Sequence, residues 1–131
     1  MLPTASDIRV LTPSAFNSLA FNGKWFVNFN KPDCPYSVKF RPVWKQLARS
    51  YLNTTLQFGQ INCHKYRDFC KMRDIYYYPT LVLFEDAFEV DVFEEDLASP
   101  DIQNFLDLAL PNSDLVNPEI ENDIANPFKS L

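Results

Sequence analysis

Cys34 is the residue whose type and position most directly predict chemistry. It lies in the segment Phe29–Ser37, between a predicted strand and a predicted helix. A thiol at the start of a helix is close to the positive end of the helix dipole, and the free backbone amides there can stabilise a thiolate. Because the thiolate is the nucleophilic form, this position predicts a reactive cysteine, which Lys31 would support and Asp33 would oppose. The alternative is a buried and inert cysteine.

The other two cysteines, Cys63 and Cys70, are seven residues apart. Three cysteines in total are compatible with one pair and one free thiol, or with three free thiols. A metal site is a weaker interpretation, because Cys63, His64 and Cys70 supply only three ligands and adjacent Cys and His ligands fit a tetrahedral site poorly. Catalysis by a Cys–His pair would require His64, the only histidine, beside Cys34, which the predicted fold does not provide. We therefore predict no metal and no other cofactor.

Hydrophobic periodicity predicts the elements that position these residues. We expect strands over residues 24–30, around Leu56–Ile61, over 80–84 and over 88–93, with a turn at 85–87. We expect helices from Pro13, capped by Thr12, to Asn22-Gly23, over 36–52 with a kink at Pro42, over 66–73, and from Ser99 to Ala109 before Pro111. With an initial strand, the order βαβαβαββα predicts an α/β fold with a mixed sheet, helices on both faces and a closing hairpin.

Composition and charge limit the classes of function. The 131 residues are 47% hydrophobic and 22% charged, which is enough for one globular domain and untypical of disorder. No segment is long and apolar enough to span a membrane. Residues 1–84 carry 11 Lys and Arg against 4 Asp and Glu, whereas residues 85–131 carry 1 against 13. This asymmetry predicts a bipolar surface whose halves partly neutralise each other, and we expect neither nucleic acid nor membrane as a partner.

Two charged segments suggest contacts outside a core. Residues 1–111 are predicted to form the folded domain, and residues 112–131 an acidic, flexible tail with two prolines and no clear period. Arg41, Lys45 and Arg49 lie four residues apart on the long helix, so they share one face. This basic stripe is either a docking face, for an acidic partner or for the chain's own acidic tail, or a solvated helix face.

Residues 5–110 resemble the thioredoxin superfamily, and most closely the protein disulfide isomerase family. The resemblance rests on Cys34-Pro35-Tyr36-Ser37 at the family's CxxC position, on Pro42 eight residues later, on the PxWxxLA-like run Pro42–Ala48, and on the YPT motif Tyr78-Pro79-Thr80. It implies a thioredoxin fold, a cis peptide bond before Pro79 and a structural disulfide between Cys63 and Cys70. It also implies that an extended client segment pairs with the backbone of Tyr78. The binding residues it implies are Pro35, Tyr36, Tyr77, Tyr78, Pro79 and Thr80. Tyr76 joins Tyr77 and Tyr78 in an aromatic surface near Cys34, with at least one of the three expected in the core.

Three positions depart from the isomerase pattern. Ser37 replaces the resolving cysteine, Asn28 replaces the buried acid six residues before the nucleophile, and Leu97 stands at about the position of an arginine. A serine hydroxyl does not attack a mixed disulfide, so the sequence excludes the two-cysteine cycle of an oxidase or reductase. Cys34 can still form a mixed disulfide, which an external thiol or a client cysteine would release.

The resemblance therefore predicts a single-cysteine, isomerase-like domain that binds client proteins or a dedicated partner through Cys34, in thiol–disulfide exchange, isomerisation, retention or chaperoning. The alternative is a redox-inactive thioredoxin-fold binding module. A structural disulfide suits an oxidising compartment, and Asn53-Thr54-Thr55 is a glycosylation acceptor sequence. We expect the endoplasmic reticulum lumen or another part of the secretory pathway, with the signal peptide outside this chain.

Overall fold

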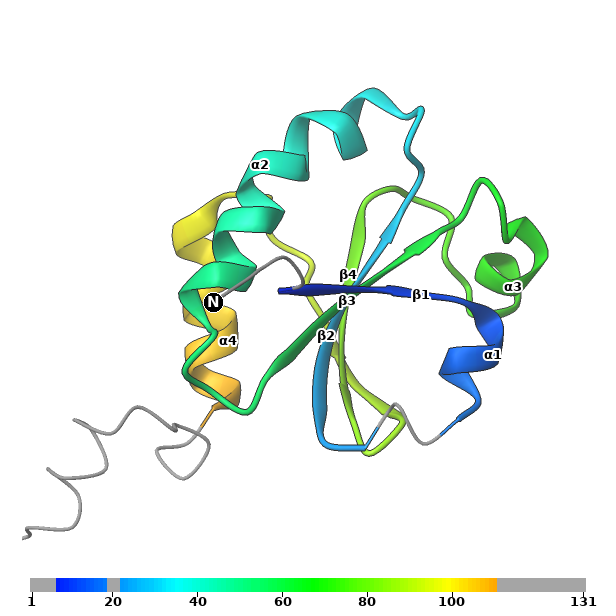
Figure 1. Ribbon diagram of the computed structural model, residues 1–131. Coiled ribbons are helices and arrows are strands. Elements are labelled where there is room, and N and C mark those ends of the chain that lie inside the picture. Colours follow the sequence, from blue (N-terminus) through cyan, green and yellow to red (C-terminus); the bar gives the residue numbers. More distant parts are fainter. Residues whose placement is uncertain (1–6, 19–21, 111–131) are drawn as a thin grey trace, which may run out of the picture.

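Five strands form one mixed sheet in the computed structural model, which describes residues 7–18 and 22–110 (Figure 1). Across the sheet the order is β1-β3-β2-β4-β5. Strands β1 and β2 run parallel to β3, whereas β4 is antiparallel to both β2 and β5. The strands are β1 (Ile8–Leu11), β2 (Lys24–Asn30), β3 (Gln57–Asn62), β4 (Thr80–Glu85) and β5 (Phe88–Val92). The predicted mixed sheet and closing hairpin are confirmed.

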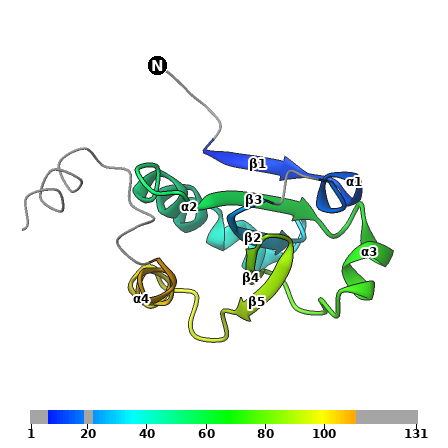
Figure 2. The same cartoon turned by 90° about the horizontal axis from the view of Figure 1, so that it is seen from below.

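Helices cover both faces of this sheet. They are α1 (Pro13–Phe16), α2 (Pro35–Ser50), α3 (Arg67–Met72) and α4 (Ser99–Ala109). Seen along the sheet, α2 and α4 lie on one side and α1 and α3 on the other (Figure 2). Together with the strand order, this arrangement is the thioredoxin fold that the sequence predicts. Helix α2 continues through Pro42.

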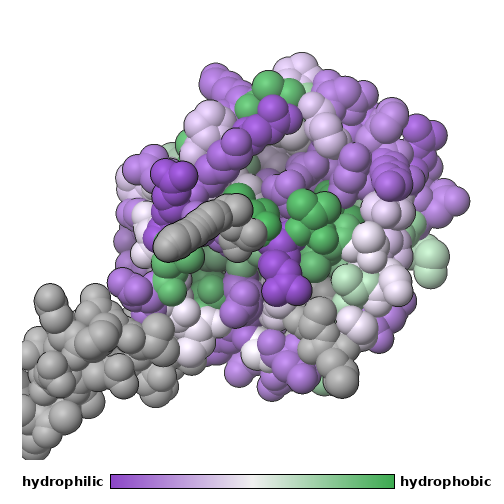
Figure 3. Space-filling view, in the orientation of Figure 1, coloured by the Kyte–Doolittle hydropathy of each residue, from purple (hydrophilic) through white to green (hydrophobic). Residues whose placement is uncertain are grey.

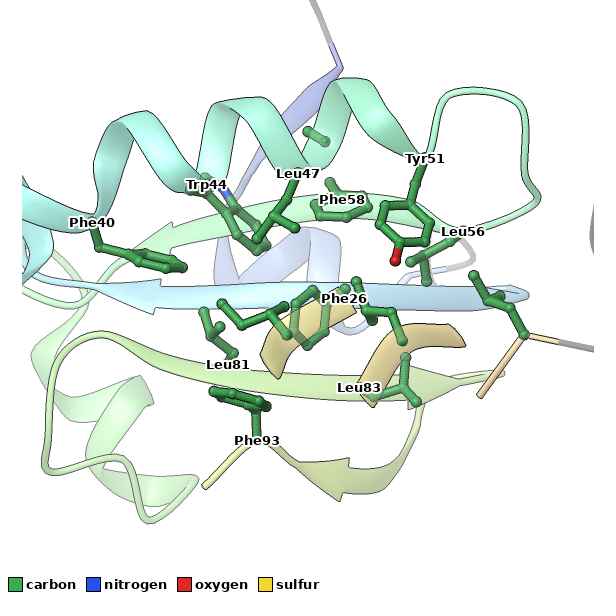
Figure 4. Close-up of a cluster of buried hydrophobic side chains, with 14 residues drawn as sticks. Phe26, Phe40, Trp44, Leu47, Tyr51, Leu56, Phe58, Leu81, Leu83 and Phe93 are labelled. Atoms are coloured by element: carbon green, nitrogen blue, oxygen red, sulfur yellow. The ribbon is translucent and has the colours of Figure 1, made fainter. Parts of the chain in front are cut away.

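The core consists of two clusters, one on each face of the sheet. Figure 4 shows the first, in which Phe40, Trp44 and Leu47 of α2 point toward Phe26 of β2 and Leu81 of β4. The second cluster receives the alternate β2 residues Trp25, Val27 and Phe29. Because β2 is buried on both faces, its hydrophobic residues run almost without interruption.

The turn between β4 and β5 fixes the hairpin and the start of β2. Asp86 and Ala87 have φ angles of 50° and 74°, as expected for a two-residue hairpin turn with both central residues at positive φ. The N–H of Gly23 donates to Asp86 Oδ1 at 2.8 Å, and the N–H of Asp86 donates to the carbonyl oxygen of Gly23 at 2.8 Å. Gly23 itself has a φ of 82°, which glycine adopts without strain.

The first helix is shorter than the sequence predicts. The helix from Pro13 ends at Phe16 and does not reach Asn22-Gly23; Thr12 does cap it, accepting the Ala15 N–H at 3.2 Å. Four residues suffice to insert Phe16 among Phe29, Phe69 and Phe84, after which the chain turns at Asn17. Leu19 and Ala20, which the spacing placed on this helix, lie outside the described residues, as do residues 111–131 with the predicted tail.

Apolar and polar residues alternate from Phe88 to Phe93, which predicts a half-solvated strand, but the final strand is less buried than that. Phe93 is buried and Val92 partly buried, but Phe88 and Val90 are 75% and 52% exposed. The pairing of β5 with β4 shifts between Leu83 and Phe84, which breaks the regular alternation of the two faces. Strand β5 is also the edge of the sheet, so the start of the strand has fewer neighbours to cover it.

Candidate functional site

Cys34 is the N-cap residue of α2, as the sequence predicts. Its backbone is extended, its N–H donates to the carbonyl oxygen of Lys31 at 2.8 Å, and its own carbonyl accepts the Val38 N–H at 3.0 Å. Pro35 is the first helical residue. A backbone N–H at this position has no partner within the helix, so the absence of an N–H in proline costs no hydrogen bond. Cys34 is a free cysteine and partly exposed, so the interpretation as a buried, inert cysteine is not supported. A thiolate here would lie at the positive end of a helix of 16 residues.

The YPT segment lies directly against this thiol. The peptide bond between Tyr78 and Pro79 is cis, and Cys34 Sγ lies 3.9 Å from the carbonyl oxygen of Tyr78. Tyr78 is partly buried against the second core cluster and donates its hydroxyl to the Ile75 carbonyl at 3.4 Å. Tyr76 and Tyr77 are 60% and 83% exposed. One tyrosine of the three therefore supports the core, and the other two form surface.

Ser37 and Tyr36 point in different directions. Ser37 is buried, with 7% exposure, and its Oγ accepts the Lys31 N–H at 3.2 Å. Tyr36 is 71% exposed. The backbone of Lys31 therefore forms hydrogen bonds with both Cys34 and Ser37. These two bonds hold both ends of the Cys-Pro-Tyr-Ser segment against the loop that contains Lys31. Thr80 is the first residue of β4 and donates its hydroxyl to the Tyr77 carbonyl.

A cavity of about 290 Å³ lies next to this segment, between α2 and the strands. Two of its buried polar atoms, Asn28 Oδ1 and Trp44 Nε1, have no hydrogen-bond partner among the residues that the structure describes. Its lining residues are Ile8, Asn28, Asn30, Pro32, Ser37, Arg41, Trp44, Lys45 and Gln60. Figure 3 looks onto the side of the molecule where β1 and α2 lie, and hydrophilic side chains surround a few apolar ones there. Asn28 was singled out from the sequence, whereas the place of Trp44 and Gln60 beside it follows only from packing.

Leu97 contributes to a second cavity, also of about 290 Å³, on the other side of α2. Tyr36, Lys39, Phe40 and Val43 complete its lining. The position at which the resemblance would place an arginine therefore carries an apolar side chain that faces the same cavity as the first turns of α2.

The disulfide of the chain joins Cys63 and Cys70, with the Cα atoms 5.8 Å apart. This is the pair that the resemblance implies. Cys63 donates its N–H to the carbonyl oxygen of Asn30 at 2.7 Å, so the disulfide loop is attached to the end of β2, from which the loop to Cys34 begins. His64 Nδ1 lies 3.8 Å from Asp33 Oδ2, which brings the only histidine to the residue preceding Cys34. Sequence spacing gave no signal for this contact.

The remaining site residues lie on the surface. Asn53 is exposed in the turn that follows α2, and Arg41, Lys45 and Arg49 are exposed along the helix. Arg49 Nε lies 3.6 Å from Asp7 Oδ2. Within residues 7–18 and 22–110, no cluster of three or more His, Cys, Asp or Glu side chains could hold a metal ion. None of the helices in the described part is both long and apolar enough to cross a membrane.

Comparison with known proteins agrees with the fold. The sequence model of the thioredoxin family matches residues 7–108. DnaJ homolog subfamily C member 10 from Rattus norvegicus is 27% identical over 100 residues, which cover 76% of this chain and 12% of the relative. Protein disulfide-isomerase 5-1 from Arabidopsis thaliana is 27% identical over 92 residues, covering 68% of this chain and 63% of the relative.

A relative from yeast and a solved structure extend the comparison. ER-retained PMA1-suppressing protein 1 from Saccharomyces cerevisiae is 29% identical over 91 residues, covering 65% of this chain and 13% of that protein. The J-Trx1 fragment of ERdj5 superposes with a TM-score of 0.71 at 27% identity, over 79% of this chain and 51% of the fragment. The chain spans only about an eighth of the length of the first relatives, since the aligned part is 12% of each.

Proposed function

The chain belongs to the thioredoxin family, and on that premise we propose that it is a protein disulfide isomerase-like domain that exchanges disulfides through a single cysteine, Cys34. The observation that supports this most directly is the partly exposed Cys34 thiol at the start of α2, 3.9 Å from the Tyr78 carbonyl oxygen. A thiol at a helix start beside a partly exposed segment, Tyr78-Pro79-Thr80, is suited to reaction with an extended polypeptide.

The proposed reaction begins with attack of the Cys34 thiolate on a client disulfide. A new S–S bond forms between Cys34 and one client sulfur, and the other client sulfur leaves as a thiolate. Ser37 occupies the place of the second thiol and cannot displace the client. Release therefore requires either the freed client thiolate or another client cysteine, which rearranges the client's bonds, or an external thiol. The domain would hold and rearrange clients without net oxidation or reduction of its own.

Client recognition is proposed to use the surface around Cys34. An extended client segment would pair with the backbone of Tyr78, and Pro35, Pro79 and Thr80 would border it. The exposed rings of Tyr36 and Tyr77 offer large contact area with a polar end, which suits a binding surface for varied polypeptides.

The proposed compartment is the endoplasmic reticulum lumen or another part of the secretory pathway. A structural disulfide between Cys63 and Cys70 persists in oxidising compartments. One relative is named as ER-retained, and the exposed Asn53 is accessible to glycosylation.

The test is capture of covalent client complexes in secretory cells, with thiols alkylated at lysis. We expect complexes that dissociate on reduction with the wild-type chain and with Ser37→Ala, and none with Cys34→Ala. Ser37→Ala is the matched control because it changes the same segment and keeps the thiol. Complexes that persist in Cys34→Ala would contradict the proposal.

A redox-inactive binding module is the second candidate, favoured by the buried Asn28 and by Leu97 where isomerase-like domains carry ionisable groups. The exposed Arg41 and Lys45 would then contact an acidic partner. This candidate predicts partner binding that survives Cys34→Ala, weakens with salt and is reduced by Arg41→Glu/Lys45→Glu. Binding that is insensitive to that double substitution rejects the docking role.

A further inference from the structure

The charges of α2 and of the segment from β5 to α4 are opposite in sign and almost unmixed. Helix α2 carries the cations Lys39, Arg41, Lys45 and Arg49 and no acidic residue. Residues 88–109 carry neither Lys nor Arg but seven acidic residues, which are Glu89, Asp91, Glu94, Glu95, Asp96, Asp101 and Asp107. Soluble monomers generally mix both signs on their surface, so two single-sign surfaces on one domain point to a charged partner.

The acidic segment lines a cavity of about 260 Å³ beside α4. Its carboxylates Asp91, Glu95 and Asp101 come from β5, from the loop after β5 and from the first turn of α4. Leu108 is also among the lining residues and is 90% exposed. An exposed apolar side chain among carboxylates favours a partner that supplies cations together with apolar contact.

The basic face of α2 supplies both kinds of contact. Arg41, Lys45 and Arg49 are exposed and share one face of the helix. Their hydrocarbon stems can cover an apolar side chain while their charged ends reach carboxylates. Arg49 Nε already lies 3.6 Å from Asp7 Oδ2. Arg41 and Lys45 are therefore the better placed of the three to meet carboxylates of another molecule.

The basic and acidic surfaces lie on neighbouring helices. Figure 2 shows α2 and α4 on the same side of the sheet, and the hydroxyl of Tyr51, the C-cap residue of α2, donates to Asp107 Oδ1 of α4 at 2.8 Å. A two-fold axis that passes between the helices would place α2 of each copy over α4 of the other. Both contacts would then form in one symmetric interface.

We propose that the chain forms a symmetric dimer in which Arg41 and Lys45 of each copy contact the acidic cavity of the other. The association is non-covalent and independent of the reaction proposed for Cys34. A helix of 16 residues is about 24 Å long and two neighbouring helices are about 20 Å wide, so the shared face covers about 480 Å² of each copy. An area of this size is at the low end of specific interfaces, so the dimer should be weak.

Salt should weaken this dimer, although the net charge of each copy is −5. At about 0.1 M salt the screening length is about 10 Å, so the repulsion between net charges is largely screened while charges in contact still attract. At about 1 M salt the screening length falls to about 3 Å, and the contacts themselves lose most of their attraction.

Sedimentation equilibrium of the full chain, with no other protein present, tests this proposal. Wild type and Cys34→Ala should both show a monomer–dimer equilibrium over about 5–500 µM at about 0.1 M salt, the range expected for an interface of this area. The dissociation constant should rise by about tenfold or more at about 1 M salt. Cys34→Ala excludes a disulfide between copies as the cause of association.

Charge reversal identifies the two surfaces. Arg41→Glu/Lys45→Glu and Asp91→Lys/Glu95→Lys should each raise the dissociation constant by about tenfold or more, because like charges then face each other. An equimolar mixture of the two variants should restore dimers to about the wild-type level, since both contacts then join opposite charges.

Lys65→Glu/Arg67→Glu is the matched control for net charge. It makes the same change of charge as Arg41→Glu/Lys45→Glu, on exposed residues at the start of α3, on the other face of the sheet. It should change the dissociation constant by less than about threefold. Circular dichroism establishes that each variant folds.

The outcomes separate this inference from the proposed function. A wild-type chain that stays monomeric at about 500 µM, a control that weakens the dimer equally, or a mixture that stays monomeric would overturn the dimer. Association that requires Cys34 would also overturn it and would leave the proposed function in place. Failure of Cys34 to form mixed disulfides would overturn the proposed function alone. Recovery of dimers in the mixture, with dimers retained by the control, supports the inference.

Discussion

The Cys34 thiol lies 3.9 Å from the carbonyl oxygen of Tyr78, which is 44 residues further along the chain. The loop that follows β2 and the segment that precedes β4 therefore meet at one point. Strands β2 and β4 are direct antiparallel neighbours, with Phe29 opposite Thr80, so the sheet itself brings the two segments together. The Cys34 thiol and the Tyr78 backbone are therefore positioned by the same pair of strands.

Alkylation of the native, unreduced protein should modify Cys34 alone. Cys63 and Cys70 are 2% and 0% exposed and share a disulfide, whereas Cys34 is free and partly exposed. Mass spectrometry of the tryptic peptides measures the modified positions, and a reduced and unfolded sample provides the full labelling of all three. Labelling of Cys63 or Cys70 without reductant would show that the disulfide is absent.

Ser37→Cys should convert the domain from a trapping to a two-cysteine site. A thiol at this buried position can attack the bond between Cys34 and the client, so mixed disulfides should become short-lived. Captured complexes are expected to fall by about tenfold or more, because internal attack occurs at a high effective concentration. Ser37→Ala is the control that removes the hydroxyl without adding a thiol. Equal trapping by Ser37→Cys and the wild type would contradict this geometry.

Removing the disulfide with Cys63→Ala/Cys70→Ala should lower the free energy of unfolding by about 2–3 kcal/mol, as expected for closure of a short loop. The substitution also loosens the loop whose Cys63 N–H donates to Asn30, next to the Cys34 segment. Urea titration measures the change. Cys34→Ala should alter stability by less than about 0.5 kcal/mol, since this side chain is only partly buried.

Tyr51 should make stability decline in alkaline solution. Burial, followed by the hydrogen bond from its hydroxyl to Asp107 at 2.8 Å, raises the pKa of Tyr51 above its usual value of 10.0. Above pH 10 the unfolded chain loses this proton while the folded chain keeps it, so the free energy of unfolding falls with rising pH, by about 1.4 kcal/mol per pH unit.

The measurement is a pair of denaturation curves for the wild type and Tyr51→Phe at pH 8 and above. Below pH 10 their difference should be constant and reflect the lost hydrogen bond, about 1 kcal/mol. Above pH 10 the decline should be smaller in Tyr51→Phe. Parallel pH profiles would show that Tyr51 ionises equally in both states.

The sequence predicted the elements whose pattern is strong and local. Helix α2 and strand β4 were found because their hydrophobic residues repeat over many positions, and the place of Cys34 followed from the boundary between β2 and α2. The helix at Pro13 was overestimated, because Leu19 and Ala20 continue its spacing while the chain has already turned at Asn17. Local periodicity does not report when tertiary packing ends a helix.

The parts of the site that depend on packing between elements could not be predicted. The cavity unites Asn28, Trp44 and Gln60 from three elements, and no spacing in the sequence relates them. The contact between His64 and Asp33 joins two loops that are far apart in the sequence, beside the hydrogen bond from the Cys63 N–H to Asn30. The exposure of Phe88 follows from a shift in strand pairing, which alternation alone does not reveal.

The outer edge of β5 carries its own protection against pairing with other chains. The Val92 N–H donates to the carboxylate of Asp91 at 2.9 Å, so a backbone donor is already occupied. Glu89 adds a further exposed negative charge on the same strand. Unfolded polypeptides are rich in extended segments that add readily to an open sheet edge. If the domain holds such clients at Cys34, the charged edge of β5 would disfavour addition of a client strand to the sheet. Binding at Cys34 would then not lead to aggregation along β5.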